Sequence, residues 1–272
     1  MFGFDQRHKF YHNMETLNAE IDLQAFFSQL HATFRKALLL DYDGTLAPFH
    51  VHPGEAIPYP GVREILDKIM QVPGTRLVII TGRWIKHLLP LLQLENQPEI
   101  WGSHGLERLK ADGSYEIAPM EEEMLSGLVR ADEWIASVGL SERCEEKPGC
   151  LALHWRGMDE ENICKVRDRV MPEWSLIAER WGLNILEFDG GIELRVPGRH
   201  KGDAVRTILE ETGKDASSAY LGDDITDEDA FKSIKGRGVG VLVREALRPT
   251  CADIWIKPPE ELLAFLARWL PR

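Results

Sequence analysis

Residues 37–46 have the sequence ALLLDYDGTL, in which an apolar run ends in two acids and a glycine. Such a short apolar run predicts a strand buried on both faces, as in a parallel sheet. Asp41 ends this strand, where ligands of α/β proteins bind. Asp41 and Asp43 point to the same side of extended backbone, and Gly44 permits a sharp turn. Close carboxylates repel unless a divalent cation or a proton relieves them, although a simple polar turn can also have this sequence.

Strands and helices alternate on both sides of a central segment, which predicts a doubly wound parallel sheet. The second strand, 76–80, ends in the turn Thr81-Gly82-Arg83, which we expect to open a helix. The first 35 residues predict a covering helix, since apolar residues from Ile21 to Phe34 recur at helical spacing. The other predicted helices lie at 61–72, 81–92, 201–211, 227–235 and 259–270, and the other strands end near Trp101 or lie at 218–222, 238–243 and 253–256.

The central segment predicts a separate α+β module inserted into this sheet protein. It begins with an expected hairpin at 107–117, around Asp112-Gly113. Two long helices should pack on a small antiparallel sheet, within the usual size of a domain. The helices are expected at 120–138 and 159–181, the second with a break near Pro172, and the strands at 142–147, 151–155, 184–188 and 192–196, with a turn at 189–191.

Composition limits the partners and the compartment. The 272 residues carry 32 Lys and Arg against 44 Asp and Glu, a net charge of −12, which argues against nucleic acid or an anionic membrane as partner. No apolar window approaches the roughly 18 residues of a membrane span, and the N-terminus has no signal-peptide pattern. The four cysteines lack CxxC spacing, although Cys144 and Cys150 could meet on neighbouring strands. We therefore expect a cytoplasmic protein, a monomer or a small homo-oligomer.

A second acidic cluster follows the predicted strand 218–222. Five acids occupy the seven residues from Asp223 to Asp229. Thr226 could cap the next helix with Asp229 as its capping-box partner. Asp223 precedes that helix, and its natural use is to bind a hard cation, Mg²⁺ by preference. The Thr81-Gly82 turn could hold a phosphate oxygen, and Arg83 and Lys201 add positive charge.

Together these elements resemble a known family. The four motifs of the haloacid-dehalogenase-like phosphohydrolases are similar, in order, to Asp41-x-Asp43-Gly44-Thr45, Thr81, Lys201 and Gly222-Asp223-Asp224-x-x-Asp227. Within this superfamily, the chain resembles the trehalose-6-phosphate phosphatases in four further motifs. These are Gly102-x-His104-Gly105, Glu145-x-Lys147, His154-x-Arg156 and Glu193-Leu194-Arg195. The resemblance implies an α/β fold, a Rossmann-like parallel-sheet hydrolase core with an inserted α+β cap domain. We expect an N-terminal helical extension at 1–36, the core at 37–108 and 197–272, and the cap at 109–196.

The resemblance also implies a mechanism and a substrate, trehalose 6-phosphate. Asp41 would be the nucleophile and Asp43 the general acid and base. Thr81 and Lys201 would neutralise phosphate oxygens. Mg²⁺ would be held by Asp41, the Asp43 carbonyl and Asp223, with Asp224 or Asp227 in support. The expected substrate-binding residues are Arg83, His104, Glu145, Lys147, Arg156 and Glu193.

Three alternatives stay open at this point. A related cap could select another glycosyl phosphate, such as glycosyl-3-phosphoglycerate or sucrose phosphate. A sugar phosphomutase shares the Asp-x-Asp-Gly-Thr motif and a cap. A non-catalytic domain of the same fold is disfavoured, because all the named catalytic positions are filled. His104 could equally be a structural histidine, and each charged cap residue could simply be solvated.

Overall fold

The structure of the protein is a computed structural model that describes residues 14–188 and 190–271. It divides into two compact units, a core that runs to Tyr115 and resumes at His200, and a cap at Glu116–Arg199. In the described part of the chain no helix combines the length and the apolar character needed to cross a membrane. The predicted α/β core with an inserted α+β module is confirmed.

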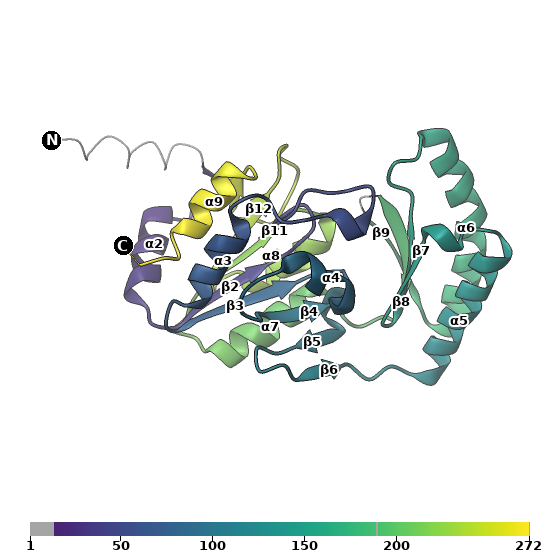
Figure 1. The fold of residues 1–272 in the computed structure, drawn as a ribbon, viewed down its shortest axis with the longest axis horizontal. Coiled ribbons are helices and arrows are strands. Elements are labelled where there is room, and N and C mark those ends of the chain that lie inside the picture. The colour runs from purple at the N-terminus through teal and green to yellow at the C-terminus, as the bar shows by residue number, and fades with distance from the viewer. Residues whose placement is uncertain (1–13, 189, 272) are drawn as a thin grey trace. The chain divides into compact units, whose positions relative to one another are not determined.

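The core is a nine-stranded sheet in the order β1-β13-β12-β11-β2-β3-β4-β5-β6 (Figure 1). The six strands from β13 to β4 are parallel, while β1 and β5 pair antiparallel at the two sides. The strands are β1 (Glu15–Thr16), β2 (Lys36–Leu40), β3 (Thr75–Ile80), β4 (Glu99–Gly102), β5 (Glu107–Leu109), β6 (Tyr115–Ile117), β11 (Ser217–Gly222), β12 (Val239–Val243) and β13 (Ile254–Ile256).

Helices cover both faces of this sheet. Because side chains alternate along a strand, Leu38 and Leu40 of β2 pack into one apolar cluster and Ala37 and Leu39 into another. The first cluster takes residues from α2 (Leu23–Ala32), α3 (Val62–Met70), α4 (Ile85–Leu92) and α9 (Glu260–Ala267). The second takes residues from α7 (Lys201–Thr212) and α8 (Glu228–Ile234). This layering explains why the parallel strands are apolar on both faces.

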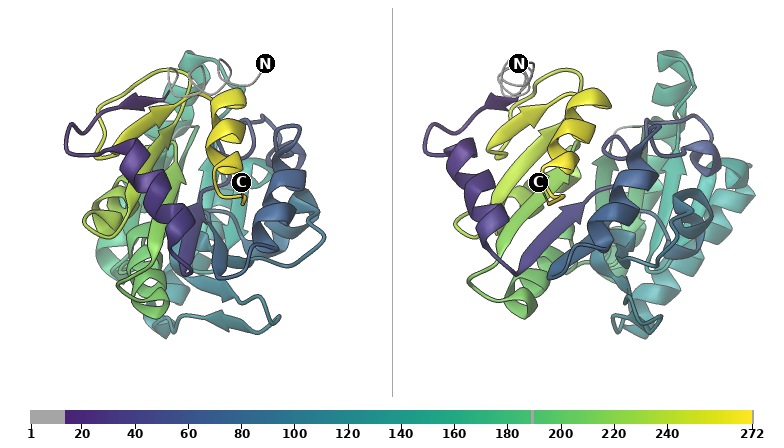
Figure 2. Two further views of the ribbon diagram at one scale, coloured as in Figure 1. Left: turned by 90° about the vertical axis from the view of Figure 1, so that its left-hand side faces the viewer. Right: turned by 60° about the vertical axis from the view of Figure 1, so that its left-hand side comes forward.

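The N-terminal helix is shorter than the apolar spacing predicted. Within the described residues it is α2 alone, while residues 1–13 of the predicted extension lie outside them. Phe27 of α2 and Phe265 of α9 stack edge to face at 5.5 Å, so the two helices, purple and yellow in Figure 2, lie side by side. Phe34 follows the helix and is 70% exposed, so its assignment to the packed face was wrong. The edge strand β1 was not predicted, because two residues carry no alternation pattern.

The cap is a four-stranded antiparallel sheet in the order β7-β8-β10-β9, with two helices on one face (Figure 1). Its elements are α5 (Glu122–Ser137), β7 (Cys144–Lys147), β8 (Cys150–His154), α6 (Glu160–Trp181), β9 (Asn184–Phe188) and β10 (Gly191–Arg195). The helix α6 continues through Pro172, so the expected break is absent. Buried Val170 and Trp174 hold both halves of α6 in place.

Two further sequence interpretations differ from the structure. The helix after the Thr81 turn begins only at Ile85, since residues 81–84 form a non-helical bend. The hairpin of β5 and β6 extends the core sheet, whereas the sequence interpretation began the cap at residue 109. The four cysteines are free thiols. Cys144 lies opposite Leu153 and Cys150 opposite Lys147, so the two cysteines are three positions apart in register.

Candidate active site

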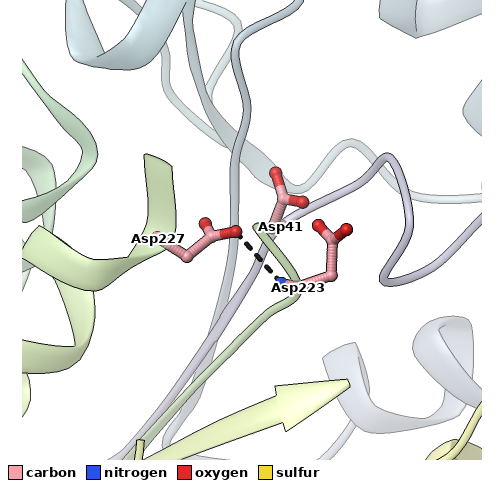
Figure 3. A group of neighbouring side chains, drawn as sticks. All are labelled: Asp41, Asp223 and Asp227. Carbon is pink, nitrogen blue, oxygen red and sulfur yellow. Dashed lines mark hydrogen bonds between the residues drawn. The ribbon is translucent and has the colours of Figure 1, made fainter. Parts of the chain in front are cut away.

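Three buried aspartates meet at the carboxyl ends of β2 and β11. These neighbouring parallel strands align Leu40 with Leu221, so the residues after them reach the same edge of the sheet. Asp41 follows β2, Asp223 follows β11, and Asp227 comes from the short turn at Ile225–Asp227 (Figure 3). One carboxylate oxygen of each lies within 4.8 Å of the others, and all three side chains are buried.

Lys201 balances part of this negative charge. It begins α7, and its Nζ donates to Asp41 Oδ1 and to Asp227 Oδ1, both at 2.7 Å. Its side chain is buried with them. A buried ammonium shared by two carboxylates forms charge-assisted hydrogen bonds, which are stronger than neutral ones. Lys201 thus lies at the acidic cluster; its expected role, to neutralise phosphate oxygens, stays a prediction.

Asp227 accepts hydrogen bonds from four donors. Besides Lys201, the Tyr220 hydroxyl donates to Oδ1, and the backbone N–H groups of Asp223 and Asp224 donate to Oδ2 at 3.0 and 2.9 Å. Figure 3 marks the bond from Asp223 N. Asp227 therefore fixes both the loop that carries Asp223 and the ammonium of Lys201.

Asp224 has a different position. Its carboxylate accepts the N–H of Ile225 at 2.7 Å and caps the turn, and it lies outside the group of neighbouring carboxylates found among the described residues. Thr226, which the sequence suggested as the cap, lies inside that turn. Asp224 was predicted as a metal residue together with Asp227; the geometry gives Asp224 a capping contact and leaves Asp227 in the cluster.

Burial and mutual repulsion shift the acidities of these groups. Burial raises the pKa of Asp41 to about 7, with Asp227 adding to the rise while Lys201 opposes it. Burial, then the charges of Asp41 and Asp227, hold the pKa of Asp223 well above its ordinary value. Burial would also raise the pKa of Asp227, but Lys201, together with the hydrogen bonds from Tyr220 and the Asp224 backbone, lowers this pKa below its ordinary value. The cluster thus concentrates negative charge that a cation or protons must offset.

Gly44 is required where the chain turns after Asp43. Its φ of +79° lies in the left-handed region, and a Cβ atom there would lie 2.2 Å from Asp223 Oδ2. No side chain fits that distance, so Asp223 packs directly against the Gly44 backbone. The glycine of the motif therefore serves both the turn and the close approach of the second acidic loop.

Arg83 contacts Asp43. Its Nε and Nη2 donate to the two carboxylate oxygens of Asp43, each at 2.6 Å. The backbone N–H of Arg83 donates to Thr81 Oγ1 at 3.1 Å. Arg83 was expected to bind substrate, which stays a prediction; in this structure its guanidinium is bonded to Asp43, the residue expected to act as acid and base.

His104 lies beside the Thr81 turn. Its N–H donates to Thr81 O at 3.0 Å, and its ring covers Gly82, where a Cβ would come within 2.6 Å of the imidazole. Ser103 and His104 both have positive φ, 47° and 57°, a backbone conformation that costs free energy and recurs at functional sites.

Glu107 supports this strained loop and was missed by the sequence analysis. It is fully buried and accepts from Ser103 Oγ at 2.7 Å and from the Tyr115 hydroxyl at 2.8 Å. Only the motif Gly102-x-His104-Gly105 nearby could have pointed to it. Arg248 was not predicted either. Its Nη2 donates to the carbonyl of Asp224 at 2.7 Å, and its Nε donates to the carbonyl of Asp223 at 3.2 Å. An isolated arginine in a loop gives no sequence signal.

The expected sugar-binding residues of the cap share one face of its sheet. The register pairs Glu145 with Ala152 and Ala152 with Glu193, and directly paired residues point to the same side. Lys147 lies two residues after Glu145 on the same face. Lys147 Nζ donates to Glu193 Oε1 at 2.6 Å, and both side chains are buried.

The same sheet face also carries His154, and Arg156 lies in the turn that follows β8. His154 Nε2 lies 3.1 Å from Glu145 Oε2. The Arg156 guanidinium packs against Gly190, where a Cβ would come within 3.0 Å of it. Burial would lower the pKa of Lys147, but Glu193, with Cys150 and Glu145, raises this pKa above its ordinary value, so the ammonium stays charged. The register thus assembles Glu145, Lys147 and Glu193 into one cluster of donors and acceptors.

The donor set at the core cluster fits a hard divalent cation. Asp41 and Asp223 offer carboxylate oxygens, the ligand type that Mg²⁺ prefers. Burial, with added repulsion from neighbouring carboxylates, raises the pKa of both groups, and a cation would favour their charged forms. Asp227 already accepts four hydrogen bonds, which suits a supporting role.

Known proteins share this sequence and fold. The chain is 29% identical over 255 residues to trehalose-phosphate phosphatase B of Arabidopsis thaliana, an alignment that covers 85% of this chain and 65% of that relative's length. The C-terminal domain of C. albicans trehalose-6-phosphate phosphatase has the same fold, with a TM-score of 0.78 at 22% identity over 94% of this chain and 98% of that domain. A phosphatase of the haloalkanoate (HAD) superfamily from Bacteroides thetaiotaomicron follows with a TM-score of 0.55 at 19% identity, covering 86% and 94%.

The comparisons confirm the resemblance drawn from the motifs. Residues 39–250, most of the chain, match the trehalose-phosphatase family. This range includes Asp41, Thr81, Lys201 and the acidic loop at 223–227. The chain belongs to the trehalose-phosphatase family and has the fold of the HAD phosphatases.

Proposed function

We propose that this protein is a Mg²⁺-dependent phosphatase that hydrolyses trehalose 6-phosphate to trehalose and phosphate, the last step of trehalose biosynthesis. One observation carries the proposal: Asp41, Asp223 and Asp227 converge with Lys201 at the carboxyl edge of the sheet. This arrangement occurs in a chain that matches the trehalose-phosphatase family.

Asp41 is the nucleophile of the proposed reaction. Its carboxylate attacks phosphorus and forms an aspartyl-phosphate, which divides one difficult displacement into two easier ones. Lys201 holds Asp41 Oδ1 at 2.7 Å and lowers its pKa, so it favours the ionised, nucleophilic form against the effect of burial. Asp43 protonates the departing sugar oxygen and then activates the water that hydrolyses the intermediate.

The charge of the phosphoryl group is balanced by groups of the core. Thr81 and Lys201 bind its non-bridging oxygens, where negative charge redistributes in the transition state. The Asp41 and Asp223 carboxylates and the Asp43 carbonyl would hold Mg²⁺, with Asp227 in support. When bound, Mg²⁺ would supply positive charge for the phosphoryl oxygens.

The cap residues provide the choice of sugar. Glu145, Lys147 and Glu193 form a cluster of acceptors and donors on one sheet face, which suits the hydroxyl groups of a disaccharide. We propose that this cluster of the cap, with Arg156, binds the trehalose part. For the core, we propose separately that His104 is a substrate-binding residue. A site built to hydrogen-bond hydroxyls discriminates strongly against substrates that lack them.

Release of inorganic phosphate tests the proposal. Trehalose 6-phosphate is compared with sucrose 6-phosphate, glucosyl-3-phosphoglycerate and glucose 6-phosphate, each with Mg²⁺ or with a chelator. We expect the highest kcat/KM for trehalose 6-phosphate, and activity only with Mg²⁺. Asp41→Asn should abolish turnover while leaving the fold intact. A higher kcat/KM for another sugar phosphate would contradict trehalose 6-phosphate as the substrate. An isomerised product without free phosphate would indicate a mutase.

A further inference from the structure

All three guanidinium nitrogens of Arg83 donate hydrogen bonds inside the core. Nε and Nη2 bind the two oxygens of Asp43 at 2.6 Å, and Nη1 donates to the carbonyl of Pro53 at 2.7 Å. The side chain is 11% exposed and its guanidinium carbon lies 5.4 Å from the centre of the Tyr42 ring. A fork bonded to both oxygens of a carboxylate fixes its position and its orientation, which a single contact cannot do.

Arg83 also connects the acid to the expected phosphate-binding group. Its backbone N–H donates to Thr81 Oγ1 at 3.1 Å, while its side chain holds Asp43. The same residue therefore sets the orientation of the Thr81 hydroxyl and the position of the Asp43 carboxylate. The Pro53 carbonyl, on the loop that follows the motif, holds the far end of the guanidinium.

We propose that Arg83 is a positioning residue, which acts through Asp43 and does not bind the sugar. Its fork places the Asp43 carboxylate beside the phosphoryl site, so that the acid can reach the departing oxygen. This inference rests on the proposed role of Asp43 as general acid. Three of the five N–H groups of the guanidinium donate to these acceptors, and two of the three hold the Asp43 carboxylate, which favours positioning over direct contact with substrate hydroxyls.

A double-mutant cycle on trehalose 6-phosphate tests this role. Arg83→Met and Arg83→Lys are made in the wild type and in Asp43→Asn, and kcat/KM and KM are measured with Mg²⁺. A general acid contributes about 100-fold to 10,000-fold, so we expect Arg83→Met to lower kcat/KM by at least about tenfold in the wild type. In the Asp43→Asn background the same change should have an effect of about twofold or less, because the group it positions is gone.

Arg83→Lys separates charge from geometry. Lysine keeps the positive charge but cannot form the bidentate fork, so it should recover only a small part of the loss. Each variant is checked for a wild-type thermal transition. If Arg83→Met does not fold, Arg83→Lys provides the same comparison in both backgrounds.

A series of aryl phosphates gives a second, independent readout. These substrates have no sugar, and their phenols differ in acidity. Good leaving groups need no proton, so Arg83→Met should lower kcat/KM for phenyl phosphate much more than for 4-nitrophenyl phosphate. A purely structural role would lower both by the same factor.

The outcomes distinguish a failure of the proposed role of Asp43 from a failure of the proposed role of Arg83. If Asp43→Asn lowers kcat/KM for phenyl and 4-nitrophenyl phosphate equally, the proposed role of Asp43 fails. If Asp43→Asn behaves as an acid variant but Arg83→Met loses the same factor in both backgrounds, only the inference on Arg83 is overturned. A raised KM for trehalose 6-phosphate in both backgrounds, with an unchanged aryl series, would identify Arg83 as a sugar ligand instead.

Discussion

Lys201→Met should destabilise the core strongly, because the ammonium is the buried positive charge bonded to Asp41 and Asp227. Both contacts are 2.7 Å, and the three side chains are at most 4% exposed. Removing one partner of a buried ion pair costs about 3–5 kcal/mol, since the remaining charge is left without compensation. With two carboxylates left behind, we expect a loss of about 4 kcal/mol in metal-free buffer at pH 8.

The pH dependence of this loss has a definite sign. Burial raises the pKa of Asp41 to about 7 even with Lys201 opposing the rise, so without Lys201 the pKa is higher still. A carboxyl group whose folded pKa is raised destabilises the fold more as the pH increases toward that pKa. The destabilisation by Lys201→Met should therefore grow as the pH rises through about 7, because wild-type Asp41 ionises there while Asp41 of the variant keeps its proton.

A cycle with Asp227→Asn shows whether the pair itself is responsible. The single change at Asp227 should cost about 3 kcal/mol, because it leaves backbone N–H groups of the acidic loop poorly paired. The double variant should cost about 5 kcal/mol, less than the sum, since Asp227 is then no longer left as a buried charge without Lys201. The free energy of unfolding is measured in urea, with hydrogen exchange in peptides from β2 and β11 as the probe, so that the result reports on the core alone. Additivity within about 0.5 kcal/mol would refute the electrostatic account.

Three further predictions concern other contacts. Gly44→Ala should abolish the thermal stabilisation by Mg²⁺ and the release of phosphate, because its Cβ would lie 2.2 Å from Asp223 Oδ2; a wild-type thermal shift would contradict this. Glu228→Gln should cost about 1 kcal/mol at pH 7. Burial would raise the pKa of Glu228, but hydrogen bonds, including one from Arg248, lower it below the ordinary 4.5, so the stability difference should be present above pH 4.5 and vanish as the pH falls through the lowered pKa. Glu193→Ala should reduce kcat/KM for trehalose 6-phosphate at least tenfold more than for 4-nitrophenyl phosphate, and equal losses would remove Glu193 from the sugar site.

The layered fold was predictable because burial leaves a clear record in the sequence. The apolar runs around Leu38 and Leu77 are typical of strands covered on both faces, and their spacing from helical segments indicates parallel order. That order alone places the ends of β2 and β11 at one edge. The meeting of Asp41 with Asp223 therefore followed from the sequence, whereas the actual distances did not.

The division of work among the acids could not be predicted. Asp224 and Asp227 are both acids near the same strand end, and the sequence left open which of them supports the metal. A short turn gives the two acids different contacts: Asp224 caps the turn, while Asp227 points back to Lys201 and the loop N–H groups. A turn of this length depends on side-chain hydrogen bonds, which periodicity does not report.

Contacts between residues far apart in the chain could not be predicted from the sequence either. Arg83 and Asp43 are far apart in the chain, as are Arg248 and the carbonyls of Asp223 and Asp224. A charged residue in isolation is usually a solvated surface group, so nothing local distinguishes an arginine that braces a loop from one that does not. Such contacts are set by tertiary packing and become visible only when the loops lie together.

The buried charges of the core explain why a site of this kind is costly to keep. The net charge of −12 describes the whole surface, yet the acids that matter for chemistry are those that the fold removes from water. Lys201 is shared by Asp41 and Asp227, while Asp223 is left with a raised pKa beside two like charges. Neutral side chains at these positions would relieve that repulsion and would also remove the proposed nucleophile and the oxygen ligands. The fold therefore maintains repulsion among carboxylates at the carboxyl edge of the sheet, where the proposed cation would offset it, and balances it only partly with its own lysine.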